Sequence, residues 1–155
     1  MLFEDQPIGI ETDLKSNFID LERLFELGFT ETGTDGYDFS ISPNIHLNFN
    51  CDIGRLHYKR FKPTSITGNL LVKNQMAVFR NVHMNGLGGA MNFDGIVNAQ
   101  HQNAIDVSSQ FNVAGIHVDS VFYIFENFKQ TFIEDRHLKG QAYADVMMEL
   151  TLNEN

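Results

Sequence analysis

Residues 91–113 read MNFDGIVNAQHQNAIDVSSQFNV, and the fold can be inferred outward from them. Two runs of alternating apolar and polar residues, 91–99 and 105–113, flank a short polar segment that contains Gln102 and Asn103. Alternation with period two is typical of strands that bury one face. Such a short gap joins antiparallel neighbours, because a parallel crossover needs about a dozen residues. The stretch therefore predicts a hairpin with one apolar face and one polar face.

The same alternation extends along most of the chain. It recurs at 45–53, 66–72 and 142–152, and less regularly at 76–84. Turn signals separate the runs, such as Lys62-Pro63 and the glycine-rich segment 86–89. We predict a mainly β (α+β) fold: a curved antiparallel meander sheet of about six or seven long strands, each with one apolar face.

Two segments break this period. Residues 118–132 place apolar side chains at steps of three and four, which predicts an amphipathic helix of about four turns. A helix of about two turns is predicted over 21–27, after Asp20 at the N-cap position. Ile10 and Ile19 correspond to Val107 and Ile116, 97 residues further on, so the two strand-to-helix junctions are candidates for a repeat. Alternatively, any two such junctions resemble each other.

Composition limits the classes of function. The chain of 155 residues suits one domain, and its 11 basic and 20 acidic residues give a net charge of −9. Such an acidic chain repels phosphate backbones, so we expect no nucleic-acid partner. No apolar run approaches the ~18–20 residues of a membrane-spanning helix. The single cysteine, Cys51, excludes an internal disulfide framework and a cysteine-rich zinc site.

The sequence contains no recognisable catalytic motif. The six histidines lack metal-ligand spacing, and the glycines of 86–89 lack the lysine and the helix of a phosphate-binding loop. We therefore predict a protein that is not an enzyme, with no catalytic residues, no cofactor and no metal site. The alternative is a polar cluster that folding brings together, which linear spacing does not reveal.

The amount of one-sided apolar sheet is the most informative feature. The two predicted helices would cover much of one sheet, but not all of a longer curved one. Either the helices close the sheet, or its apolar face stays open to an apolar ligand or to more of the same chain. The expected lipid-facing residues are Ile45, Leu47, Phe49, Ile53, Leu70, Val72, Phe93, Val97, Val107, Phe111 and Val113. Three helix residues are expected to plug one end: Phe122, Phe125 and Phe128.

Several short motifs in residues 40–152 carry a family resemblance. They are Pro43-Asn44-Ile45, Thr67-Gly68-Asn69-Leu70, Phe79-Arg80-Asn81-Val82, Phe111-Asn112-Val113 and the phenylalanine-rich segment 122–130. Their order and spacing resemble the AsmA-like proteins of Gram-negative bacteria, particularly the long versions of Bacteroidetes. This family is similar to the repeating β-groove, bridge-like lipid-transfer proteins, whose sheets carry acyl chains along an apolar interior.

The resemblance implies a function and a location. It implies the periplasmic part of an inner-membrane-anchored envelope protein that holds or conducts phospholipid in outer-membrane assembly and lipid transport. Its partners would be acyl lipids and either the rest of a longer chain or envelope proteins. This sequence departs from the family because it has no anchor or signal peptide and ends at Asn155. We therefore expect a fragment, or a reading frame that starts at an internal Met1.

The expected organisation is a single partial β-groove segment over residues 1–155. Residues 1–28 would end a preceding repeat, and residues 40–152 would supply the AsmA-like strands and helix. The alternative is a closed β-rich structural or protein-interaction module with no lipid ligand.

Overall fold

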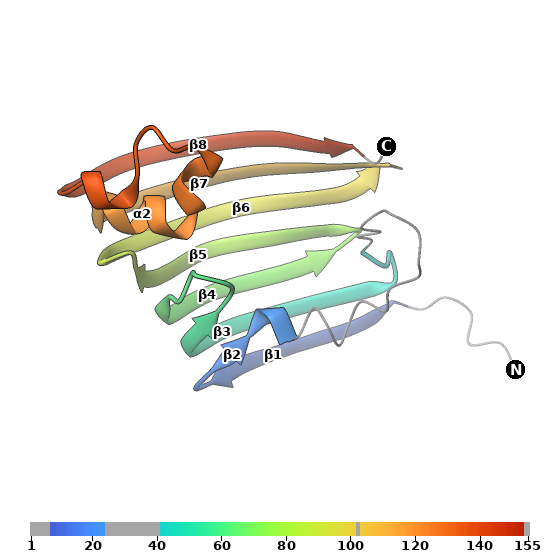
Figure 1. Ribbon diagram of the computed structural model, residues 1–155. Coiled ribbons are helices and arrows are strands. Elements are labelled where there is room, and N and C mark those ends of the chain that lie inside the picture. Colours follow the sequence, from blue (N-terminus) through green and yellow to red (C-terminus); the bar gives the residue numbers. More distant parts are fainter. Residues whose placement is uncertain (1–6, 24–40, 102, 154–155) are drawn as a thin grey trace, which may run out of the picture.

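The computed structural model describes residues 7–23, 41–101 and 103–153, and these form one open sheet (Figure 1). The spatial order is β1-β3-β4-β5-β6-β7-β8, with the short β2 beside β3. The strands are β1 (Ile8–Ser16), β2 (Ile19–Asp20), β3 (Ile45–His57), β4 (Thr64–Lys73), β5 (Met76–Gly86), β6 (Gly89–His101), β7 (Ala104–His117) and β8 (Gln141–Asn153). The predicted mainly β fold is confirmed.

Strand direction follows the prediction from β3 onward. Every neighbouring pair from β3 to β8 is antiparallel and in chain order, as in a meander. The first strand differs, because β1 pairs with β3 in parallel and places Ile10 beside Leu47. The two junctions of the suggested repeat therefore lead to different neighbours: β1 lies parallel to β3, whereas β7 lies antiparallel to β8.

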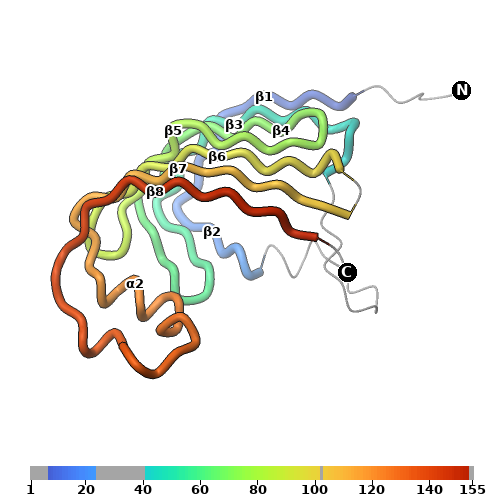
Figure 2. The backbone as a smooth tube through the Cα atoms, turned by 90° about the horizontal axis from the view of Figure 1, so that it is seen from above, coloured from blue at the N-terminus to red at the C-terminus, as the bar shows by residue number. Residues whose placement is uncertain are grey.

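The sheet bends strongly toward one side (Figure 2). Register shifts interrupt the β4–β5, β5–β6 and β7–β8 pairs. Four residues at these shifts have positive φ, namely Ser65 (52°), Gly68 (150°), Asn81 (48°) and Gly115 (68°). Such bulges bend a strand and increase its twist. The bulge at Asn81 is satisfied locally, because its backbone N–H donates to Asp94 Oδ1 over 2.8 Å.

The predicted four-turn helix is wrong in length. The helix α2 (Val118–Ile124) has seven residues, and the 3₁₀ segments η1 (Glu126–Lys129) and η2 (Asp135–His137) follow it. The four residues of η1 have left-handed φ values between 50° and 58°, so the chain reverses there. No described helix combines the length and apolar character needed to cross a bilayer.

Aromatic packing accounts for this reversal. The ring of Phe128 lies 5.1 Å from that of Phe122 and 5.3 Å from that of Phe125. In a continuous helix, six residues separate two side chains by about 9 Å along the axis. Phe125 and Phe128 are three residues apart and would be neighbours in a helix as well. The turn therefore exchanges helical hydrogen bonds for the Phe122–Phe128 pair, worth about 1 kcal/mol.

The beginning of the shorter predicted helix lies within the described residues. Residues 21–23 are helical, and Asp20 Oδ1 accepts a hydrogen bond from the backbone N–H of Arg23 over 3.2 Å. This bond confirms Asp20 as the N-cap. Residues 24–27, which would complete the helix, lie outside the described part of the chain.

Candidate apolar binding face

Strand register places all of the expected lipid-facing residues on the same face of the sheet. Directly paired residues of neighbouring strands point to the same side. One such row crosses the sheet through Leu47, Val72, Ala77, Val97, Val107 and Leu150. A second row contains Val82, Phe93, Phe111 and Val146. We call this side the apolar face. It also includes Ile45, Phe49, Ile53, Leu70 and Val113.

Figure 2 shows α2 and the segments after it on the inner side of the curve, at one end of the sheet. Burial of apolar-face side chains at that end places the apolar face on this inner side. Among the described residues, the buried apolar side chains are Ile53, Ile66, Met91 and Ile116, all from this face. The connection between β3 and β4 contributes Pro63, which is fully buried. The compact core of the described structure is therefore restricted to one end of the sheet.

The rest of the apolar face is only partly covered. Phe49, Phe93 and Phe111 are half-buried, and the border residues Ile10 and Val146 are 46% and 45% exposed. Eight residues of a strand span about 26 Å, and seven strands span about 29 Å. Partly exposed apolar side chains spread over such a broad face are unusual for a soluble monomer and mark a binding surface. The apolar face is therefore the leading candidate for a binding surface.

A row of aromatic rings lines the centre of the apolar face. The ring of Phe93 stacks on that of Phe111 at 4.8 Å and lies 5.5 Å from that of Phe79. A Cβ atom at Gly95 would lie 2.7 Å from Phe93 Cζ. The glycine therefore makes room for the ring to lie flat along the sheet, which leaves a smooth apolar surface instead of a projecting side chain.

The opposite, convex face carries mostly polar side chains, although Leu71, Val78 and Ile96 form an apolar row on it. The side-chain amide of Asn69 donates to Asn48 Oδ1 over 2.8 Å and to Asn50 Oδ1 over 3.1 Å. Asn112 donates to Asp145 Oδ1 over 2.7 Å on the last strand pair. These hydrogen bonds join neighbouring strands on the convex face and support their register. The two faces of the sheet therefore differ in chemistry.

One hydroxyl on the apolar face leads to a stability prediction. Ser109 is buried, and its Oγ has no hydrogen-bond partner among the described residues. An unsatisfied buried hydroxyl costs about 1–3 kcal/mol. We expect Ser109→Ala to raise the free energy of unfolding by about 1 kcal/mol in urea denaturation. Ser108→Ala on the exposed side of the same strand should change it by less than about 0.5 kcal/mol. Equal effects of the two substitutions on the free energy of unfolding would contradict the assignment of Ser109 Oγ as a buried hydroxyl without a partner.

Cys51 lies on the apolar face, between Leu14 of β1 and Gly68 of β4. Burial raises the pKa of its thiol above the ordinary value of 9.0, because desolvation disfavours the thiolate. The folded chain therefore holds the thiol proton to higher pH than the unfolded chain does. We expect slower alkylation by iodoacetamide at pH 8 in the folded protein than in urea, and stability that declines as the pH rises above about 9. Equal alkylation rates in the folded protein and in urea would show that the fold does not raise the pKa of the Cys51 thiol.

The expected helix plug is a folded cluster of rings and not a helical stripe. Phe122 belongs to α2, whereas Phe125 and Phe128 lie beyond its end and are 56% and 54% exposed. Arg60 attaches this region to the β3–β4 connection, because its Nη1 donates to the Tyr123 carbonyl over 2.8 Å. Its guanidinium also lies 4.7 Å from the centre of the Tyr123 ring. The cluster is thus held at one end of the sheet.

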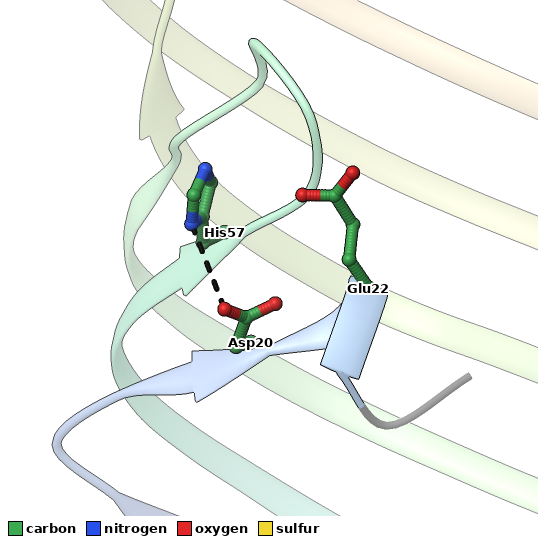
Figure 3. A group of neighbouring side chains, drawn as sticks. All are labelled: Asp20, Glu22 and His57. Atoms are coloured by element: carbon green, nitrogen blue, oxygen red, sulfur yellow. Dashed lines mark ion pairs between the residues drawn. The ribbon is translucent and has the colours of Figure 1, made fainter. Parts of the chain in front are cut away.

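A polar group lies beside β2 and the end of β3 (Figure 3). The ligand atoms of Asp20, Glu22 and His57 all lie within 4.8 Å of one another. It is the one group with metal-ligand geometry in residues 7–23, 41–101 and 103–153. The spacing of residues along the sequence does not reveal this group, because Asp20 and His57 come together only through the parallel pairing of β2 with β3.

Comparison with protein-family models, curated proteins and solved structures finds no match to the chain. The resemblance to AsmA-like proteins therefore stays a prediction, and the chemistry of the apolar face has to be interpreted from its own geometry.

Proposed function

We propose that this chain is a non-enzymatic lipid-binding segment, whose apolar face holds the acyl chains of phospholipid or a similar lipid. The observation that carries the proposal is the broad, half-exposed apolar surface on the inside of a curved sheet. Burial of acyl chains on such a surface is non-directional and contributes about 0.8 kcal/mol per CH₂ group. No catalytic group is needed for this role.

The dimensions of the apolar face support this proposal. One leaflet contributes about half of the ~30 Å hydrocarbon core of a bilayer, so an acyl chain in a bilayer spans about 15 Å. The face is about 26 Å along the strands and about 29 Å across them. It is therefore long and wide enough for more than one acyl chain. The carboxylates of the convex face repel anionic phosphates, so the lipid headgroup would lie at the rim.

The cellular setting of the proposal rests on the family resemblance. An AsmA-like segment would act in the periplasm, in phospholipid transport and outer-membrane assembly, alongside the rest of a longer chain or other envelope proteins. The open apolar face is compatible with this role, because a conduit for acyl chains has to remain accessible along its length.

Mass spectrometry of organic extracts tests the proposal directly. The folded chain would be purified from a Gram-negative host and its extract compared with that of a mock purification. We expect near-stoichiometric phospholipid in the protein sample only. A stable, folded monomer without lipid would contradict the proposal.

The second candidate function is a protein-interaction module without a lipid ligand. Among the described strands, β8 forms one border of the sheet, and its Tyr143 and Met147 are 72% and 80% exposed. A strand at a sheet border presents unpaired backbone groups to which another chain can pair. A dye that fluoresces on exposed apolar surface separates the two functions. Strong binding by the delipidated monomer favours the lipid groove, and no binding favours the interaction module.

A further inference from the structure

Asp20, Glu22 and His57 come together from three short pieces of structure. Asp20 belongs to β2, Glu22 to the helical turn 21–23, and His57 to the end of β3. The register of β2 on β3 places Asp20 directly beside His57. Figure 3 shows the two carboxylates and the imidazole ring directed toward a common space. The backbone pairing therefore brings Asp20 and His57 together, and Glu22 joins them from the helical turn that follows β2.

The hydrogen bonds around the group leave the ligand atoms available. His57 Nε2 lies 3.0 Å from the carbonyl oxygen of Lys59, which can only accept, so Nε2 carries the proton. In the neutral imidazole, Nδ1 then has the lone pair, and it lies 3.8 Å from Asp20 Oδ2. Metal-binding histidines commonly donate their other N–H to a backbone carbonyl in this way. Asp20 Oδ1 is occupied by the N-cap bond to Arg23, which leaves Oδ2 facing the ring.

The separations of these atoms are close to those of a metal site. Ligands at about 2.0–2.2 Å from Zn²⁺ lie roughly 3.0–3.5 Å from one another. The Asp20–His57 distance of 3.8 Å therefore has to shorten by about 0.3–0.8 Å, and a separation at the overall limit of 4.8 Å by up to about 1.8 Å. Glu22 lies in the helical turn and not in a strand, so its side chain can approach without a change in strand pairing, whereas the Asp20–His57 distance has to close through these two side chains.

We propose that Asp20, Glu22 and His57 bind one divalent cation of the zinc type. One imidazole nitrogen and two carboxylate oxygens suit Zn²⁺, whereas Mg²⁺ and Ca²⁺ prefer sites made of oxygen alone. The two carboxylates balance the charge of the ion, and a water molecule completes four-fold coordination. The ion ties β2 and the start of the following helix to β3, where the described pairing has only two residue pairs. This inference does not depend on the proposed lipid function.

Calorimetric titration of the full chain with zinc chloride tests the site. We expect one Zn²⁺ per chain, with affinity weakened about tenfold or more in each of Asp20→Asn, Glu22→Gln and His57→Ala. Asparagine at position 20 keeps the N-cap, so Asp20→Asn should remain folded by circular dichroism. His101→Ala is the matched control. His101 Nδ1 lies 3.2 Å from Asp106 Oδ2, but no third ligand joins this pair among the described residues. His101→Ala should therefore leave the affinity for Zn²⁺ unchanged.

Two further measurements distinguish a built site from weak adsorption of Zn²⁺ to an acidic chain. In ¹⁵N spectra, Zn²⁺ should shift the His57 Nδ1 resonance while Nε2 keeps its proton. Zn²⁺ should also raise the melting temperature of the unaltered chain, but not that of Asp20→Asn. The proposal would be overturned by three results: no Zn²⁺ binding, binding that all three variants leave unchanged, or displacement of Zn²⁺ by equimolar Mg²⁺.

Discussion

Replacement of Phe111 by aspartate is expected to remove nearly all of the bound lipid while the chain stays folded. Phe111 lies at the centre of the apolar face, stacked on Phe93. A carboxylate there stays hydrated on the empty face but has to be desolvated beneath an acyl chain, which costs several kcal/mol. Each 1.4 kcal/mol lowers affinity about tenfold, so lipid in the extract should fall below detection.

Gln110→Asp is the matched control, because Gln110 is the neighbouring residue on the convex face of β7. It adds the same charge to the same strand and should leave the lipid content unchanged. Phe49→Asp, on β3, repeats the test at a second position of the apolar face. If the folded Phe111→Asp and Phe49→Asp variants retain lipid as the unaltered chain does, these residues do not line the binding surface.

Replacement of Gly89 by alanine is expected to have the largest effect on folding. An added Cβ would lie 2.3 Å from the Ala114 carbonyl oxygen and 2.7 Å from the Ile116 backbone nitrogen. Both atoms belong to the backbone around the bulge of β7, which cannot move as a flexible side chain can. Overpacking of this kind costs about 3 kcal/mol, a large share of the roughly 5–15 kcal/mol that stabilises a domain.

Urea denaturation measures this effect, with Gly9→Ala as the control. Gly9 lies on β1, and an added Cβ there would meet nothing within 4 Å. We expect Gly9→Ala to change the free energy of unfolding by less than about 0.5 kcal/mol. Similar midpoints for Gly89→Ala and the unaltered chain would show that β6 does not approach β7 as closely as described.

The period-two pattern predicted the strands well, because alternation is a local property of the chain. The runs at 45–53, 66–72, 91–99 and 105–113 all lie within strands of the structure. The less regular run at 76–84 corresponds to β5, whose bulge at Asn81 shifts the alternation by one residue. That bulge explains both the weaker pattern and part of the curvature.

The helix prediction was wrong because the structure of residues 118–132 depends on contacts that a local pattern does not show. Steps of three and four in residues 118–132 satisfy the helical pattern, but they do not reveal that aromatic residues pair more closely when the chain reverses. The parallel position of β1 was also hidden, because apolar alternation is the same for both strand directions. Strand direction depends on the long-range connection between β1 and β3, and alternation carries no information about it.

The sequence by itself determined that this chain is a sheet with one apolar face and one polar face, since that property follows from alternation along each strand. It also determined which side chains share the apolar face once neighbouring strands are paired. Only the tertiary structure decided that the described helices cover one end of that face. The tertiary structure also decided that Asp20 lies beside His57. These two residues are far apart in sequence and come together only through the register of β2 on β3.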